Sequence, residues 1–417
     1  MTSVADPAIT KGRATAQEAA PFATARDIRL DFFRGLAMFI ILCAHTPNNF
    51  FTSWIPARWG FSDATEIFVF CSGMASAIAF GRSFDRAGWI LGTGRVAFRV
   101  WQVYWAHIGM FFAIAAMLAS FDLFGTFEDP YIGTLNLWAF FEDPGPALVG
   151  LFTLTYVPNY FDILPMYLVI LAMMPLMMAL SRVSLWAVAG AIGLLWVLAQ
   201  GALLDSLGLG ALRLAFAAEP WSDRAWFFNP FGWQLIFFTG FAFMRGWLPK
   251  PPVSAPLIGI AALIVIAIIP LSHIGMREIF GPFAPDIREG IIDWRIANQG
   301  LFFKSDFGIL RYVHFLGLAY LCWVAAGDGG ARLKTVGAGL GARAWGALLQ
   351  MILKVGQQSL AVFVFSMVFA RFSGFVMDQI GRNTWNMTLA NLVGFAALIL
   401  VAYTVAWFKS QPWRLAR

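Results

Sequence analysis

The amino-acid sequence predicts an all-α fold: a polytopic integral membrane helical bundle of about ten transmembrane helices, with both termini in the cytoplasm. Hydrophobic residues make up 59% of the 417 residues and charged residues only 12%, roughly half the charged fraction of a soluble domain. Apolar runs of about 18 residues or more recur along the chain, each long enough to cross a hydrocarbon core about 30 Å thick. Lys and Arg gather on one side of these runs, as the positive-inside rule expects.

The apolar runs divide into ten segments, each expected to form one membrane-spanning helix. In chain order they are 32–50, 63–81, 97–119, 160–180, 184–204, 229–247, 254–273, 308–326, 357–377 and 386–407. A weaker apolar stretch, 134–157, is interrupted by two acidic residues and two prolines, which suit neither lipid nor an unbroken helix. We expect it to be re-entrant or interfacial, and it is the one candidate for an eleventh span.

The basic residues set the expected topology. With the N-terminus placed in the cytoplasm, the inward connections hold about twice as many Lys and Arg residues as the outward ones. The outward connections 120–159, 205–228 and 274–307 instead hold most of the carboxylates, together with many Trp, Phe and Pro residues. We therefore expect a disordered cytoplasmic tail at 1–25, one transmembrane domain at 26–408 and a cytoplasmic tail at 409–417.

The charge and the cysteines exclude several kinds of site. The net charge of +6 is explained by inward-facing loops, so the expected partner is the lipid bilayer and no nucleic-acid partner is expected. Cys43, Cys71 and Cys322 lie inside apolar segments without the spacing of metal ligands. No nucleotide loop, serine nucleophile elbow or zinc motif is present. No metal site and no bound cofactor are expected.

Two ionisable residues share one face of the first span. Arg34 and His45 are eleven residues apart, which is 20° more than three full turns, and they are separated by roughly 16 Å along the axis. Intramembrane ionisable groups are costly and are often functional. Arg34 can be an interfacial anchor, a partner of Asp31, or a ligand of an anion such as a CoA phosphate. His45 precedes Pro47, which loosens the helix end, so its imidazole is expected to face a wet cavity.

The second span begins with two carboxylates at a similar depth. Asp63 and Glu66 are three residues apart and share a face near the outer surface. If the spans are antiparallel, these carboxylates lie level with His45, which suits a general base oriented by a carboxylate. Asp63 also suits an N-cap of this span, whereas capping explains Glu66 poorly. Glu66 is therefore the first candidate to orient His45, and Asp63 is the second.

The remaining candidates lie at the two ends of the bundle. On the inner side, Arg82, Arg95 and Arg99 lie among glycines between the second and third spans, a composition that can cradle phosphates or only obey the positive-inside rule. On the outer side, Arg311 and His314 share a face of the eighth span and can bind an acidic or sugar group or serve as anchors. Asp162 starts the fourth span as a candidate for acceptor binding or for a cap.

Several of these motifs together resemble one family. RDIRLDFFRGLAMFI followed by His45, GFSDATEIFVFCSG, YFDILPMYLVIL, FFNPFGWQLIFFTG, LRYVHFLGLAYL and GQQSLAVFVFS occur in family order, and the chain resembles the OpgC proteins. These inner-membrane enzymes succinylate osmoregulated periplasmic glucans and belong to a superfamily of transmembrane acyltransferases. Many members of that superfamily carry an Arg and a His separated by ten residues on the first span, as Arg34 and His45 are.

The resemblance implies a multi-pass enzyme of the bacterial inner membrane that moves an acyl group from cytoplasmic acyl-CoA to a periplasmic glucan hydroxyl. Succinyl-CoA as co-substrate is implied by the family alone. In this hypothesis Arg34, with the three inner arginines, holds the donor, and His45 deprotonates the sugar hydroxyl. Direct attack and a transient acyl-histidine both fit. The alternative is a proton-coupled transporter or glycan exporter, for which Arg34 has no role.

Overall fold

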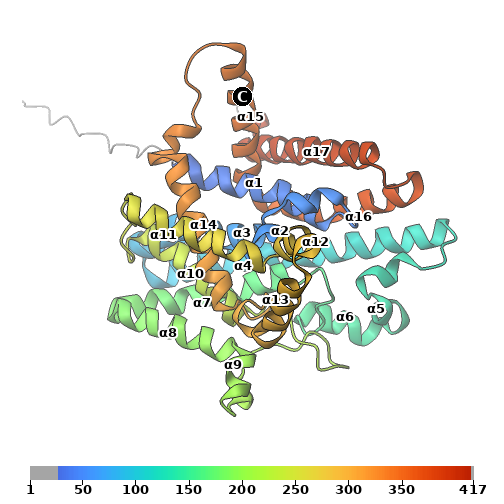
Figure 1. The fold of residues 1–417 in the computed structure, drawn as a ribbon, viewed down its shortest axis with the longest axis horizontal. Coiled ribbons are helices and arrows are strands. Elements are labelled where there is room, and N and C mark those ends of the chain that lie inside the picture. Colours follow the sequence, from blue (N-terminus) through green and yellow to red (C-terminus); the bar gives the residue numbers. More distant parts are fainter. Residues whose placement is uncertain (1–26, 415–417) are drawn as a thin grey trace, which may run out of the picture.

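The described part of the protein is helical. The structure is a computed structural model that describes residues 27–414, so the expected tail at 1–25 and the last three residues lie outside it. Within that range there is no strand, and the one β-bridge pairs Ala217 with Ala225. The long helices are α1 Ile28–His45, α3 Ala64–Ser76, α4 Arg82–Phe124, α7 Ile163–Val183, α8 Leu185–Ala199, α10 Pro230–Arg245, α11 Ala255–Ile268, α14 Ile309–Ala326, α15 Leu340–Gln357, α16 Ser359–Ile380 and α17 Thr384–Ser410 (Figure 1).

Short helices fill the outward connections, among them α2 Pro56–Trp59, α5 Trp138–Glu142, α6 Pro144–Thr153, α9 Gly201–Ser206, α12 Gly281–Phe283 and α13 Pro285–Ala297. The stretch 134–157 forms α5 and α6, which have 5 and 10 residues. At 1.5 Å per residue neither can cross a hydrocarbon core. This agrees with the re-entrant or interfacial interpretation and not with an eleventh span.

Five of the described helices are long and apolar enough to cross a membrane, or six if the bent pair 255–271 and 275–283 is one span. The other expected spans miss these criteria for simple reasons. Helix α1 carries Arg29, Asp31 and Arg34, whereas α8 and α10 have only 15 and 16 residues. Ten crossings and the orientation of the termini therefore stay predictions.

One of these five segments, Ala64–Phe124, has a reversal inside it. Gly88 has φ 77° and ψ 179°, which lie outside the helical region and suit glycine. The Arg95 Nη1 donates a hydrogen bond of 2.7 Å to the Ser83 Oγ, although twelve residues of straight helix would separate them by roughly 18 Å. The chain therefore folds back at Gly88, and the second and third expected spans are separate helices joined by a helical turn instead of an open loop.

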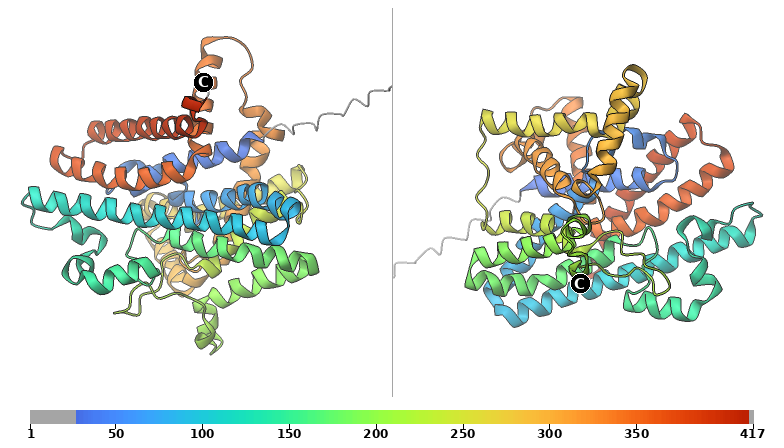
Figure 2. Two further views of the ribbon diagram at one scale, coloured as in Figure 1. Left: turned by 180° about the vertical axis from the view of Figure 1, so that it is seen from behind. Right: turned by 60° about the horizontal axis from the view of Figure 1, so that its bottom comes forward.

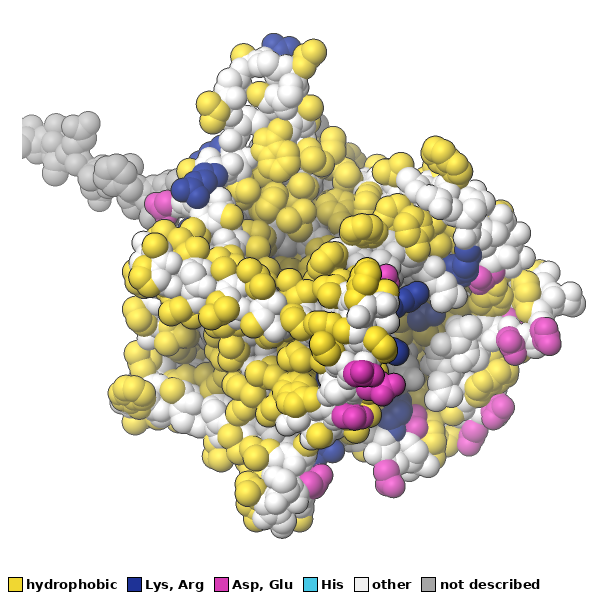
Figure 3. Space-filling view, viewed as in Figure 1, with side chains coloured by type: hydrophobic (Ala, Val, Ile, Leu, Met, Phe, Trp, Pro, Cys, Tyr) yellow, Lys and Arg dark blue, Asp and Glu magenta, His cyan; other side chains and the backbone are white. Residues whose placement is uncertain are grey.

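Helix α1 lies near the centre of the bundle. It contacts α3, α15, α16 and α17, and α4 contacts both α7 and α16. Many of these helices run along a common direction, whereas α14 and α15 run steeply across them, with α15 at the upper edge of the view (Figure 1). Figure 2 shows the same arrangement from two further sides. The outer surface of the helices is apolar over wide areas, and charged side chains gather toward one end of the view (Figure 3). A soluble protein rarely exposes so much contiguous apolar surface, and lipid is the solvent that suits it.

Candidate active site

His45 is the last residue of α1 and lies beside a cavity. Its Nδ1 is 2.8 Å from the Ile41 carbonyl oxygen. A carbonyl only accepts, so Nδ1 carries the proton and Nε2 keeps its lone pair. The His45 ring meets the Tyr160 ring edge to face, with centroids 5.3 Å apart. This tautomer leaves Nε2 able to accept a proton from a ligand.

We call the cavity beside His45 the outer chamber. It has a volume of about 350 Å³ and is lined by Ala44–Asn49, Thr52, Arg58, Tyr160 and Arg371. Its floor is held firmly, since the Asn49 side chain donates 2.8 Å to the Asn391 side chain of α17. Arg382 donates 2.5 Å to the Pro47 carbonyl and fixes the chain where it leaves α1. The chamber is thus a preformed pocket with one imidazole and two guanidinium groups.

The two carboxylates of the second span form an ion network instead of contacting His45. Glu66 Oε1 accepts from Arg311 Nε at 2.8 Å and from its Nη2 at 2.5 Å, while Oε2 accepts from the Asp63 backbone N–H at 2.8 Å. Asp63 Oδ2 accepts from Lys304 at 2.5 Å, and Oδ1 accepts from the Thr65 N–H at 2.6 Å. Glu66 is therefore occupied by Arg311, and it does not orient the His45 ring.

This network lies close to the outer chamber all the same. The charges of Lys304, Arg371 and Asp63 all act on the His45 imidazole. Asp63 also completes a capping box with Glu66 at the start of α3. The sequence predicted Asp63 as the N-cap of this helix. In the structure Glu66 takes part in the same cap, so both carboxylates have a capping role.

The three predicted acceptor residues are bonded within the protein and do not line the outer chamber. Arg311 pairs with Glu66, as described. His314 is buried, and its Nδ1 lies 2.7 Å from the Ser62 Oγ. Asp162 is buried and accepts from the Phe227 backbone N–H at 2.8 Å, which fixes the end of the 205–228 connection against α7. All three are therefore engaged by partners within the protein.

The predicted donor arginines come together at the other end of α1. Arg34, Arg95 and Arg99 line one pocket of about 360 Å³ with Tyr167 and Ser359. Arg82, Arg86 and Arg95 line a neighbouring pocket of about 570 Å³. Arg95 and Ala79 belong to both, so we call the two pockets together the inner chamber. Arg34 donates 2.8 Å to the Gly356 carbonyl and lies 3.4 Å from Asp31, which aims its guanidinium.

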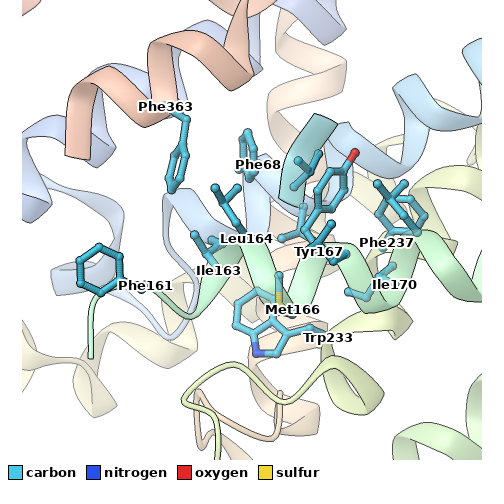
Figure 4. Packing of buried hydrophobic residues seen from close by; sticks show 14 of the residues in the cluster. Phe68, Phe161, Ile163, Leu164, Met166, Tyr167, Ile170, Trp233, Phe237 and Phe363 are labelled. Carbon is cyan, nitrogen blue, oxygen red and sulfur yellow. The ribbon is translucent and has the colours of Figure 1, made fainter. Parts of the chain in front are cut away.

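An apolar contact that we call the seal lies beside the inner chamber. Phe68 of α3 and Phe363 of α16 stack with ring centroids 5.7 Å apart, and Leu164 of α7 lies beside them (Figure 4). Phe68 and Leu164 also line the inner chamber. The stretch of α1 between Arg34 and His45 contains the buried apolar side chains of Met38, Ile41 and Leu42. The two chambers are therefore distinct, and they lie at opposite ends of one helix, roughly 16 Å apart along its axis.

Comparison with known families decides the relationship. The family model described as OpgC protein matches residues 26–410, nearly the whole chain. The chain belongs to the OpgC family. Comparison with curated proteins gave no match, and comparison with solved structures gave none either. Membership of the OpgC family and the apolar helices indicate a membrane protein with the role of a glucan-modifying acyltransferase.

No metal centre accompanies this site in residues 27–414. That part of the OpgC chain has no group of three or more His, Cys, Asp and Glu side chains able to hold a metal ion. Cys43, Cys71 and Cys322 are free thiols.

Sequence reasoning missed four charged or aromatic residues that the structure brings to the site, namely Arg58, Tyr160, Lys304 and Arg371. Lys304 and Arg371 gave a usable signal. Lys304 is one of the few basic residues of the outward connections, and Arg371 lies inside the apolar run 357–377, where a cation needs a reason. Tyr160 gave no signal, because an aromatic ring at a helix start is common at a membrane interface.

Proposed function

We propose that this OpgC-family protein transfers a succinyl group from succinyl-CoA in the cytoplasm to a hydroxyl of a periplasmic glucan. The carrying observation is the pair of chambers at the two ends of α1. One is lined by Arg34 and other arginines, and the other is lined by His45 with a free Nε2 lone pair. An anionic thioester suits the first and a hydroxyl to be deprotonated suits the second.

In this proposal the donor enters the inner chamber, where Arg34, Arg82, Arg95 and Arg99 bind the phosphates of CoA. Guanidinium groups suit phosphates because each presents several N–H donors in a fixed plane. The thioester then reaches toward the outer chamber through the seal. Phe68 and Phe363 are the rings that have to part, because they stack across the gap between α3 and α16.

The reaction then takes place at His45. The Nε2 accepts the proton of the sugar hydroxyl while its oxygen attacks the thioester carbonyl carbon. The carbon–sulfur bond breaks, the CoA sulfur takes the proton, and a succinyl ester and free CoA are formed. The same residues suit a two-step route. His45 Nε2 first attacks the carbonyl carbon and the carbon–sulfur bond breaks, releasing the CoA thiolate. The sugar hydroxyl oxygen then attacks the acyl-histidine, the carbon–nitrogen bond breaks, and the hydroxyl proton passes to the CoA sulfur.

The ion network takes a supporting role. Asp63 and Lys304 lie near enough to act on the imidazole charge, and Asp63 can stabilise the imidazolium that forms during transfer. Tyr160, whose hydroxyl donates 2.7 Å to the Met367 carbonyl, is held as a fixed wall against the His45 ring. Glu66 acts through Arg311 and so maintains the position of Asp63.

The test is donor-dependent transfer by the purified protein in lipid nanodiscs, with succinyl-CoA and a neutral glucan as substrates. Mass spectrometry follows the succinylated glucan, and a thiol assay follows CoA release. We expect His45→Ala to lower transfer by about 10²- to 10⁴-fold, the range of a general base. His273→Ala is the matched control, because His273 is exposed and lies outside both chambers.

Near-normal transfer by a folded His45→Ala protein would exclude the catalytic role of this residue. A transporter, in contrast, would move glucan across the membrane of a vesicle without any release of CoA. The thiol assay therefore separates the two functions even where no acylated product is found.

A further inference from the structure

We propose that Arg371, with Arg58, binds the free carboxylate of a dicarboxylic acyl group beside His45 and so selects such groups over neutral ones. The inference rests on the proposed function and adds the residues that set its donor specificity. Both arginines line the outer chamber together with His45. A carboxylate held there would fix the other end of a short acyl chain next to the imidazole.

Arg371 is placed by the same ring that places His45. Its guanidinium carbon lies 4.3 Å from the centroid of the Tyr160 ring, on which it stacks. Tyr160 in turn meets the His45 ring edge to face, 5.3 Å between centroids. The cation and the base thus contact one aromatic side chain, so their relative position is fixed before a ligand arrives. Such preorganisation is what a specificity site requires.

Neither chamber arginine has a protein carboxylate as partner within residues 27–414. Seven other arginines of that range have a carboxylate within ion-pair distance through a guanidinium Nη, namely Arg29, Arg34, Arg213, Arg224, Arg245, Arg311 and Arg382. Arg58 and Arg371 form no such pair.

An unpaired guanidinium at such a place needs an explanation. Removing a cation from water costs several kcal/mol unless an opposite charge accompanies it. Arg382, two residues beyond the end of α16, has Asp378 as its counter-ion, whereas Arg371 faces a cavity. A ligand carboxylate would supply the missing charge and would accept from the two Nη groups in the bidentate geometry that guanidinium prefers.

The anion is more simply assigned to the acyl donor than to the acceptor. A neutral glucan offers hydroxyl groups, for which Asn48, Asn49 and Thr52 in the chamber are suitable partners. A dicarboxylic acyl group has its free carboxylate two or three methylene groups from the carbonyl carbon under attack. One chamber of about 350 Å³ that holds both His45 and Arg371 can therefore receive both ends.

A cation beside His45 has one other use, namely stabilising the oxyanion of the tetrahedral intermediate. Oxyanion stabilisation and carboxylate binding differ in which acyl donors they affect. An oxyanion forms with every acyl group, so its loss slows all donors alike. A carboxylate contact exists only with a dicarboxylic donor, so its loss slows that donor alone. The ratio between donors therefore measures the proposal directly.

The experiment compares succinyl-CoA with its neutral monomethyl ester as donors in the nanodisc assay, for wild type, Arg371→Gln, Arg371→Lys and Arg58→Gln. The control is Arg277→Gln, because Arg277 is exposed and lies outside the chamber. We expect Arg371→Gln to lower kcat/KM for succinyl-CoA by about 10- to 100-fold, the loss of a charged hydrogen bond, and to change that for the ester less than threefold. Arg371→Lys should lie between, and Arg58→Gln should show a smaller loss of the same kind.

Equal losses for both donors would overturn the proposal in favour of an oxyanion or structural role, and so would unchanged kcat/KM for succinyl-CoA. A second measurement covers the case in which the ester is too slow to follow: free succinate should inhibit the wild type more than acetate does, and Arg371→Gln should abolish that difference. Failure of the proposed function looks different, since the wild type itself would then release no CoA with any donor.

Discussion

The ion network and the outer chamber lie side by side, and they treat charge in opposite ways. In the network, Asp63, Glu66, Lys304 and Arg311 satisfy one another through hydrogen bonds of 2.5 to 2.8 Å. In the chamber, Arg58, Arg371 and the His45 Nε2 face a cavity without a carboxylate partner in the described chain. Paired charges hold a fold together, whereas unpaired ones beside a cavity mark where a ligand binds.

The largest effect is expected from breaking the network at Glu66. Glu66→Ala leaves Arg311 buried without its counter-ion, which costs about 3–5 kcal/mol, so the unfolding midpoint should fall steeply. The double variant Glu66→Leu with Arg311→Met removes both charges and should recover most of the stability. Thermal unfolding in nanodiscs measures both. If Glu66→Ala were as stable as the double variant, the network would not have the structural role assigned to it.

Arg34 combines features of the paired and the unpaired charges. It has protein partners, as the residues of the ion network do, and it also lines a chamber. Arg34→Gln should raise KM for the CoA donor about tenfold, equivalent to about 1.4 kcal/mol, with kcat changed less than threefold. Steady-state kinetics with succinyl-CoA measure this. The exposed Arg182 at the end of α7 provides the matched control variant. A loss confined to kcat would assign Arg34 to the transition state instead.

His107 sharpens the comparison, since it is unpaired but lines none of the three cavities described. It is buried in α4, and neither ring nitrogen has a hydrogen-bond partner in the described chain. Such a group costs about 1–3 kcal/mol, so His107→Leu should raise the free energy of unfolding by about 1 kcal/mol and leave transfer unchanged. A loss of transfer without a loss of stability would place His107 among the functional residues. It would contradict the expectation that an unpaired polar group has a function only where it lies beside a cavity.

The smallest effect on stability is expected at an ion pair that is exposed to solvent. Arg245 donates 2.7 and 3.0 Å to the two Asp85 oxygens, and this hydrogen bonding lowers the pKa of Asp85 below its ordinary 3.8. A lowered pKa adds stability above the ordinary value and loses it as pH falls through the lowered one. Asp85→Asn should therefore cost under about 1 kcal/mol at pH 7, and the difference in unfolding midpoint should vanish at the acid end of a pH series.

Sequence reasoning located the helices well because apolar length and charge placement are local signals. It also placed Arg34 and His45 on one helix, with a cavity expected at His45, because helical periodicity is sufficient for that. It assigned Glu66 to the wrong neighbour. Depth along a membrane can be counted in residues, but rotation about the helix axis depends on which helix packs alongside. Arg311, which is 245 residues further along the chain, is the neighbour that the packing supplies.

The arginines of the inner chamber were also predicted only in part, because their contacts depend on how the helices pack. Their positions near the inner end followed from the positive-inside rule, but their convergence required the reversal at Gly88, which brings Arg95 back to Ser83. Arg371 and Tyr160 were missed because their roles arise from the middle of α16 and the segment before α7, which meet only in the folded chain.

The contact between α3 and α10 has a consequence for how the seal opens. A Cβ added at Gly73 would lie 1.9 Å from the Phe237 carbonyl oxygen, and one at Gly240 would lie 2.3 Å from that of Phe70. Two reciprocal backbone contacts without room for a methyl group leave α3 no freedom to slide. Phe68 is therefore held in place against α10, and we expect the Phe363 side chain to be the one that turns aside when the seal opens.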